Sequence, residues 1–169
     1  MTTPIVVNVP GLAAILIARA DGELSELGYT QNGAQITFEG YELRVPGDEN
    51  GGDDGPPVEI QYLGQTARVR LELTKFDPNV SDLVLARLAL GTLGTPITTG
   101  TPTGTLLFAD QQFFRLVINS PIRPFNFPCA VLAKAPQELN VGTKFQRHII
   151  EAECYKHPTT GVLWNRSVT

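Results

Sequence analysis

The chain has 169 residues, a length that suits a single domain, and its 16 glycines and 13 prolines exceed the usual share of turn-forming residues. This composition favours an all-β fold. The formal net charge of −4 excludes the basic surface expected of a nucleic-acid-binding protein.

The first predicted elements are two short strands. Ile5–Val9 is rich in β-branched residues and ends at a Pro-Gly pair. The apolar run Leu12–Arg19 fits a strand or a helix by periodicity alone, and the turns on both sides of it favour a strand. No basic segment precedes these runs and Pro10 interrupts them, so we expect neither a signal peptide nor a membrane span.

Two further strands are predicted at Leu27–Thr30 and Ala34–Val45, with Asn32-Gly33 between them. Asn-Gly is the strongest short signal for a β-hairpin, so a tight turn is expected at this pair. Within the second strand the apolar residues change phase at Gly40. The change predicts a bulge or a bend at that position.

The segment from Gly47 to Pro57 is predicted to be a long acidic loop. It has six Gly or Pro and four acidic residues in eleven positions, so it has almost nothing to bury. We expect it to be mobile in a free subunit and ordered in an assembly. Strands are predicted after it at Val58–Leu63 and Gln65–Phe76, and the second alternates with a period of two, typical of a strand with one buried face.

One helix is expected in the C-terminal half, at about residues 82–90, because Ser81 is a suitable N-cap and Gly91 a suitable stop. After it we expect an irregular loop at 92–104, a hairpin of 105–108 and 113–118, a surface turn at 120–128, and strands at 129–133 and 143–156. The chain as a whole, residues 1–169, is predicted to be one antiparallel β-sandwich or barrel flanked by this helix. Its core is predicted to contain Ile36, Phe38, Val69, Leu71, Leu83, Leu116, Ile118 and Ile150.

The titratable residues do not form a catalytic pattern. His148 is expected to be a half-buried strand residue and His157 an exposed turn residue, and no nucleophile motif accompanies them. Glu151 and Glu153 could act as the carboxylate pair of a glycosidase, but they lie on the wet face of a predicted strand. Cys129 and Cys154 form no Cys-x-x-Cys pair and are expected to be buried thiols. We therefore expect neither an enzyme nor a cofactor.

The acidic loop is predicted to be a contact surface for other copies of the chain. No basic run lies beside its carboxylates in the sequence, so the opposite charges are expected on a neighbouring copy. The same carboxylates could be merely solvated, or could bind a hard cation such as calcium, but their spacing departs from the EF-hand pattern. The aromatic and proline tract at 121–128 could add a sticky rim. The candidate interface residues are Asp48, Glu49, Asp53, Asp54, Arg68, Arg70, Arg123 and Phe125.

The tract Leu27-Gly28-Tyr29-Thr30-x-Asn32-Gly33-x-x-Ile36 resembles the opening hairpin of tail tube proteins of long-tailed bacteriophages. The order of elements after it is also similar. It comprises an acidic turn, Pro57-Val58-x-Ile60, Gly64, a strand ending in Leu71-x-Leu73-Thr74, a short helix, a C-terminal strand and Gly161-Val162-Leu163. The tracts at 92–104 and 121–128 have no counterpart in that layout.

The resemblance implies a β-sandwich or barrel with one helix, assembled into hexameric rings that stack into a tube, with a long loop reaching the next ring. Residues 47–57 match that loop in place. It implies a structural protein of the virion, present in the host cytoplasm during assembly. Its partners would be its own copies and other virion proteins, without a membrane or specific nucleic-acid binding. Two alternatives stay open: a capsid decoration or cement protein that acts as a trimer, and a small ligand- or carbohydrate-binding β-sandwich.

Overall fold

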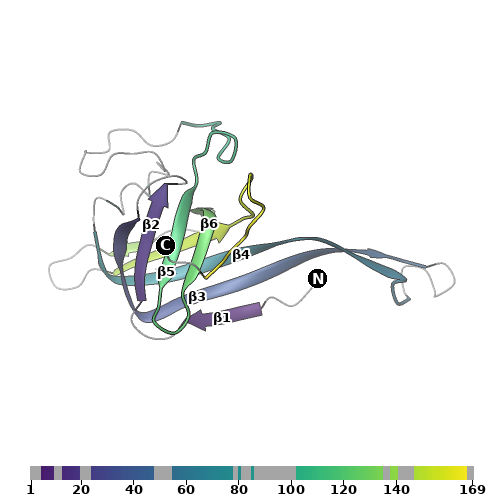
Figure 1. Ribbon diagram of the computed structural model, residues 1–169, viewed down its shortest axis with the longest axis horizontal. Helices are drawn as coiled ribbons and strands as arrows, with labels where there is room; N and C mark the ends of the chain where they lie inside the picture. The colour runs from purple at the N-terminus through teal and green to yellow at the C-terminus, as the bar shows by residue number, and fades with distance from the viewer. Residues whose placement is uncertain are drawn as a thin grey trace.

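The described part of the chain contains eight β-strands, which form one antiparallel sheet in the computed structural model (Figure 1). The strands are β1 (Ile5–Val9), β2 (Ala13–Arg19), β3 (Ser25–Val45), β4 (Glu59–Phe76), β5 (Phe114–Asn119), β6 (Phe125–Leu132), β7 (Glu138–Asn140) and β8 (Arg147–Cys154). The structure describes residues 5–9, 13–19, 24–47, 55–77, 80, 85, 102–134, 138–140 and 147–166.

Six of the described strands close into a barrel in the order β3, β2, β5, β6, β8 and β4, where β4 pairs again with β3. Strand β1 continues along the edge of β3 beyond β2, and β7 pairs with β8. The all-β prediction is confirmed. Of the two expected architectures the chain adopts the barrel, because β3 has partners along both of its edges.

Alternation along the strands builds the core of the barrel. In β4 the inward row Ala67, Val69, Leu71 and Leu73 is at most 2% exposed, while the residues between them face outward. Seven of the eight residues predicted for the core are buried: Ile36, Phe38, Val69, Leu71, Leu116, Ile118 and Ile150. The eighth, Leu83, lies outside the described residues.

Strand β3 is continuous where a hairpin turn was expected, so the prediction of a turn at Asn32-Gly33 is wrong. The pair forms a bulge instead. Thr30 lies opposite Leu73 but Ala34 lies opposite Leu71, which leaves extra residues on β3, and Gly33 has a positive φ of 82°. The bulge falls where β3 changes its neighbour from β2 to β1, and pairing along both edges overrides the local preference for a turn.

The C-terminal half also departs from the expectation. Residues 105–108 form no strand, and residues 107 and 108 lie in a turn. Residues 125–128, expected in a surface turn, begin β6, and Pro128 lies at a register shift between β5 and β6, a bulge where the ladder does not require its N–H. The last strand, expected over residues 143–156, is found as β8. The helix expected at about residues 82–90 lies outside the described residues apart from Leu85, and it stays a prediction.

The segment before β5 packs on the outside of the barrel. Phe113, Cys129 and Val131 form a second buried cluster there, against which Leu107 and Tyr155 pack. The ring of Phe108 meets that of Tyr155 edge to face at 5.2 Å between centroids. This cluster fixes Tyr155 on the outer face of the barrel.

Candidate assembly interface

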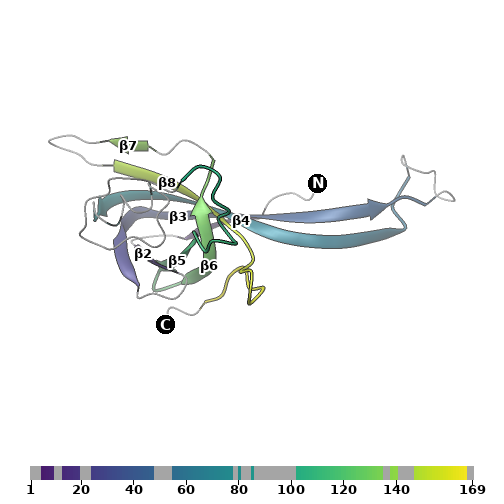
Figure 2. The ribbon, with the colours of Figure 1, turned by 90° about the horizontal axis from the view of Figure 1, so that it is seen from above.

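A two-stranded arm projects from the barrel (Figures 1 and 2). The last barrel-facing pair of buried residues on β3 and β4 is Phe38 opposite Ala67, and the ladder then continues to Val45 opposite Glu59. Beyond that pair the N–H of Val58 donates to the carbonyl oxygen of Val45 at 3.0 Å. Seven residues of strand at about 3.3 Å each carry the tip roughly 23 Å past the barrel.

A bulge in β4 sets which way the arm's side chains point. Tyr41 lies opposite Gly64 and Glu42 lies opposite Tyr62, so Leu63 is an extra residue on β4. Gly64 accommodates the bulge with a φ of +146°, which side chains rarely adopt. The bulge predicted at Gly40 is not found there: β3 pairs in register from Glu39 to Tyr41, and the bulge lies in β4 at Leu63.

Each face of the arm carries one apolar row and one polar row. On the face that continues the outside of the barrel, Tyr41, Leu43 and Val45 of β3 lie beside Gln61 and Glu59 of β4. On the opposite face, which continues the inside of the barrel, Ile60 and Tyr62 of β4 lie beside Glu42 and Arg44 of β3. The apolar rows therefore come from different strands and point in opposite directions.

The apolar side chains of the arm are uncovered on both faces. Seven of the twelve exposed large hydrophobic residues of the described chain lie here, between 39% and 60% exposed: Tyr41, Leu43, Val45, Val58, Ile60, Tyr62 and Leu63. An exposed apolar patch of this kind in a soluble protein marks an interaction surface. A two-stranded ribbon alone is also only marginally stable in water, so burial against a partner would stabilise it.

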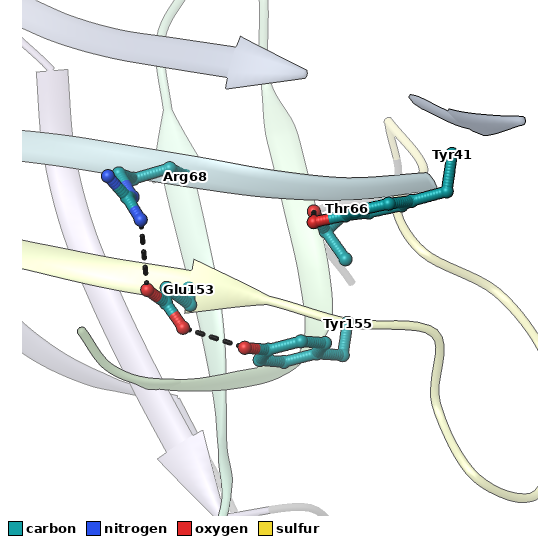
Figure 3. Close-up of polar contacts among 5 residues, drawn as sticks. All are labelled: Tyr41, Thr66, Arg68, Glu153 and Tyr155. Atoms are coloured by element: carbon teal, nitrogen blue, oxygen red, sulfur yellow. Dashed lines mark hydrogen bonds and ion pairs between the residues drawn. The ribbon is translucent and has the colours of Figure 1, made fainter. Parts of the chain in front are cut away.

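Polar side chains anchor the root of the arm on the outer face of the barrel (Figure 3). Arg68 binds Glu153 at 3.1 Å, and the hydroxyl of Tyr155 donates to the other oxygen of that carboxylate at 2.6 Å. Burial first, and then this hydrogen bond, raise the pKa of Tyr155 to about 12. The hydroxyls of Tyr41 and Thr66 lie 3.4 Å apart beside this network.

The predicted interface residues lie in different environments in the structure. Arg68 and Arg70 face outward as expected, but each already has a partner in its own chain: Arg68 with Glu153 at 3.1 Å, and Arg70 with Glu151 at 3.8 Å. Arg123 is exposed in the turn between β5 and β6. The four acidic residues of the loop lie outside the described residues, and their role stays a prediction: Asp48, Glu49, Asp53 and Asp54.

Phe125 is part of the core rather than of a surface rim. Its side chain is 3% exposed and its ring stacks on that of Phe127 at 6.2 Å and packs on Trp164 at 5.4 Å. The exposed apolar residue of that turn is Ile122, which is 71% exposed. A contact through this region would therefore use Ile122 and not the ring of Phe125.

The histidines and glutamates considered for catalysis are packed against other side chains or paired within the fold. His148 is fully buried, not half-buried as expected, with its ring 5.2 Å from that of Phe76. His157 is half-buried, not exposed as expected, and its Nδ1 accepts hydrogen bonds from the backbone N–H groups of Thr159 and Thr160 at 3.2 and 3.3 Å. Glu151 and Glu153 are the ion-pair partners of two arginines on the barrel's outer face, as given above.

Both cysteines are buried thiols, as predicted. Burial raises the pKa of Cys129 to about 11 and that of Cys154 well above its usual value. Across the described ranges, no group of three or more His, Cys, Asp or Glu side chains is placed to hold a metal ion. Within the same ranges, no helix has both the length and the apolar character needed to cross a membrane.

Sequence reasoning missed the apolar arm residues as a contact surface. Two signals for them were present: the phase change at Gly40, which moves the apolar row of β3 away from the core face, and the apolar residues of Val58–Leu63 directly after the acidic loop. Alternation shows which face a residue lies on, but not whether the chain itself covers that face. The predicted interface was centred on the acidic loop at the tip of the arm. The exposed apolar surface lies instead along β3 and β4, the strands that carry this loop.

Comparisons with known proteins find a weak similarity among solved structures. No family model matches the chain, and no curated protein matches it. Among solved structures it is similar to a chain of one described as "Virion of native gene transfer agent (GTA) particle". The sequence identity is 12% and the TM-score 0.45, over 83% of this chain and 90% of that chain. A TM-score below 0.5 at this identity establishes neither a shared fold nor a shared function.

Proposed function

We propose that the chain is a non-enzymatic structural subunit that assembles with copies of itself, and that the assembly is the tail tube of a phage-like particle. The observation that carries this proposal is the projecting arm with uncovered apolar side chains on both faces. An arm of this kind gains from contact with another molecule, because each half-exposed side chain still has surface to remove from water.

The arm obtains little of this cover from the rest of its own chain: Lys156 lies over the ring of Tyr62 at 5.7 Å, but Tyr62 is still 60% exposed. The ladder between β3 and β4 is continuous to its last pair, Val45 opposite Glu59, and it holds the tip away from the barrel (Figure 2). The cover must therefore come from a second molecule. Further copies of the same chain are the partner supported by the resemblance to tail tube proteins in the order of elements after residues 27–36.

The arm of one copy would meet the barrel or the arm of the next copy through a different surface. Such a head-to-tail contact is heterologous, and repeated heterologous contacts generate rings or open filaments rather than closed pairs. Contacts of this kind build the rings of a tube and equally a cyclic trimer, so they disfavour only a closed two-fold pair. The interior of the barrel is occupied by large side chains, among them Phe127, Leu116 and Ile150 at 0–1% exposure, which disfavours a carrier of small ligands.

The test compares the wild type with a variant whose arm is shortened. Glu42 and Tyr62 lie directly opposite one another, so residues 43–61 can be replaced by Asn-Gly, which suits a two-residue hairpin turn. Both proteins are examined on a sizing column and by negative-stain electron microscopy. We expect rings or tubes from the wild type and folded monomers from the short-arm variant.

Each of the other possible results would contradict one part of the proposal. Trimers of the wild type that need the arm would favour the decoration protein. A wild type that stays monomeric at high concentration would refute self-assembly. Tubes formed by the short-arm variant would show that the arm is not the joint.

A further inference from the structure

The inner face of the arm, which continues the inside of the barrel, carries two charged and two apolar side chains side by side. In the ladder Glu42 of β3 lies opposite Tyr62 of β4, and Arg44 of β3 lies opposite Ile60 of β4. Ile60 and Tyr62 are 49% and 60% exposed, and both charged residues are exposed as well. This face therefore presents one acidic and one basic residue on one strand beside an apolar pair on the other.

The two charges of this face are not paired within the described part of the chain. The ion pairs found there are those of Arg68 and Arg70 with β8, and they involve neither Glu42 nor Arg44. Residues two apart on a strand are separated by about 7 Å, so the two charges lie near one another without meeting. Lys156 covers part of the Tyr62 ring, but it leaves most of that side chain accessible. The whole face is thus available to a second molecule.

The arrangement of these four residues is complementary to itself. A second arm can lie face to face with the first and run in the opposite direction, related to it by a two-fold axis. This axis is perpendicular to the strands and passes midway between the two residue pairs, so β3 faces β3 and β4 faces β4. Glu42 of each copy then meets Arg44 of the other. In the neighbouring row, Tyr62 of each copy meets Ile60 of the other.

Other ways of laying two arms together do not match in this way. If the arms ran in the same direction about a two-fold axis, β3 of one copy would face β4 of the other, and the charged residues would lie on Ile60 and Tyr62. The outer face of the arm has Gln61 and Glu59 as its polar row and carries no Lys or Arg to pair with the carboxylate of Glu59. Charge complementarity therefore selects the inner face and the antiparallel orientation.

We infer that two free subunits pair through the inner faces of their arms, with Glu42 of each copy against Arg44 of the other, as a resting form that precedes assembly. Pairing removes the apolar side chains of this face from water and adds a second layer to a two-stranded ribbon that alone is marginally stable. The two barrels do not obstruct it, because each arm projects past its own barrel and the barrels lie at opposite ends of the pair (Figure 2).

This pair is distinct from the head-to-tail assembly proposed above. A two-fold contact closes on itself and does not propagate, whereas a tube built from head-to-tail contacts has no such axis. The pair must therefore open before the subunit enters a tube. The inference thus goes beyond the proposed function, because it concerns the state of the subunit before assembly.

Exchange of the two charges tests the pair, with sedimentation equilibrium at protein concentrations below those that give rings or tubes. Glu42→Arg leaves only basic residues on the polar row, and Arg44→Glu leaves only acidic ones. Each variant alone turns both ion pairs of the dimer into repulsions, so its dissociation constant should rise roughly tenfold or more. The double variant, Glu42→Arg with Arg44→Glu, restores opposite charges across the axis and should pair like the wild type.

A mixture and a matched control make the test specific. An equimolar mixture of the two single variants places a basic row against an acidic row, so a mixed pair should form more tightly than either variant pairs with itself. The control Glu59→Arg makes the same change of charge as Glu42→Arg at an exposed residue of the arm, but on the outer face. It should pair like the wild type.

The outcomes separate this pair from the proposed function. A wild type that stays monomeric up to the concentration at which rings or tubes form overturns the pair and leaves self-assembly intact. A wild type that forms the pair and nothing larger supports the pair and refutes the tube. A pair that survives both single variants, is not restored by the double variant, or is lost in the Glu59→Arg control overturns the inferred contact. A wild type that remains monomeric at every concentration refutes both.

Discussion

Replacing the apolar rows of the arm by threonine separates assembly from folding. The variant carries Leu43→Thr, Val45→Thr, Ile60→Thr and Tyr62→Thr, two substitutions on each face. Threonine keeps a high preference for strands, so the ladder between β3 and β4 is retained. The four side chains are 50%, 39%, 49% and 60% exposed in the free subunit, so the barrel derives little of its stability from them.

The magnitude follows from the surface that remains exposed. Full burial of a side chain of this size is worth about 1.5–3 kcal/mol, so the exposed half of each leaves about 1 kcal/mol to be gained in an assembly. Threonine retains part of that gain, and we take about 3 kcal/mol for the four substitutions together. The dissociation constant between subunits should then rise roughly a hundredfold. The free energy of unfolding should change by no more than about 2 kcal/mol, since substitutions at exposed positions usually cost up to about 0.5 kcal/mol each.

Sedimentation velocity across a concentration series measures the association, and urea unfolding of the dilute monomer measures the stability. Leu106→Thr is the matched control, because Leu106 is 67% exposed but lies off the arm, and it should change neither quantity. Assembly of the fourfold variant at wild-type concentrations would refute the role of the arm. A large loss of monomer stability would show instead that these residues support the barrel.

The remaining predictions concern the core, the loop and the thiols. Leu71→Ala should lower the free energy of unfolding by roughly 2–5 kcal/mol in urea titrations, because Leu71 is fully buried, and an unchanged midpoint would contradict the register of β4. Deleting Asp48–Gly55 should leave a folded monomer that no longer assembles, as judged by circular dichroism and a sizing column, and normal assembly would rule the loop out as a joint. Salt should weaken wild-type assembly without unfolding the subunit, and replacing the four acids of that loop by Asn or Gln should flatten the dependence seen by light scattering. The raised pKa of Cys129 means that the folded state favours the neutral thiol, so stability is complete below about pH 9 and falls as the pH rises towards about 11, and Cys129→Ala should reduce that fall in urea titrations across this range.

The sequence was most informative where one face of a strand is buried. The alternation of Ala67, Val69, Leu71 and Leu73 with charged residues identified β4 and its inward row correctly, because a half-buried strand has a period of two. The Asn32-Gly33 prediction failed for a tertiary reason. The local preference for a turn is worth little against a strand that is paired along both edges, and the pair is accommodated as a bulge.

Closure of the barrel and exposure of the arm could not be predicted from local patterns. The pairing of β6 with β8 and of β8 with β4 joins residues far apart in the chain, and alternation carries no information about which strands meet. The ion pairs of Arg68 and Arg70 with β8 depend on that same pairing. Sequence reasoning therefore assigned these arginines to a neighbouring copy, and the structure gives them partners within the chain.

The phase change of β3 at Gly40 gives a physical reason why the free arm can resist aggregation and still bind a partner. If the apolar phase of β3 continued unchanged past Phe38, the residues at 42 and 44 would be apolar and would lie beside Ile60 and Tyr62. One face would then be wholly apolar and the other wholly polar, which is the arrangement that promotes unspecific aggregation of an exposed edge. The phase change instead places Glu42 and Arg44 opposite the apolar residues of β4, and Gln61 and Glu59 opposite those of β3. Each face can be buried against a partner that matches both of its rows, and neither presents a continuous apolar surface while the subunit is free.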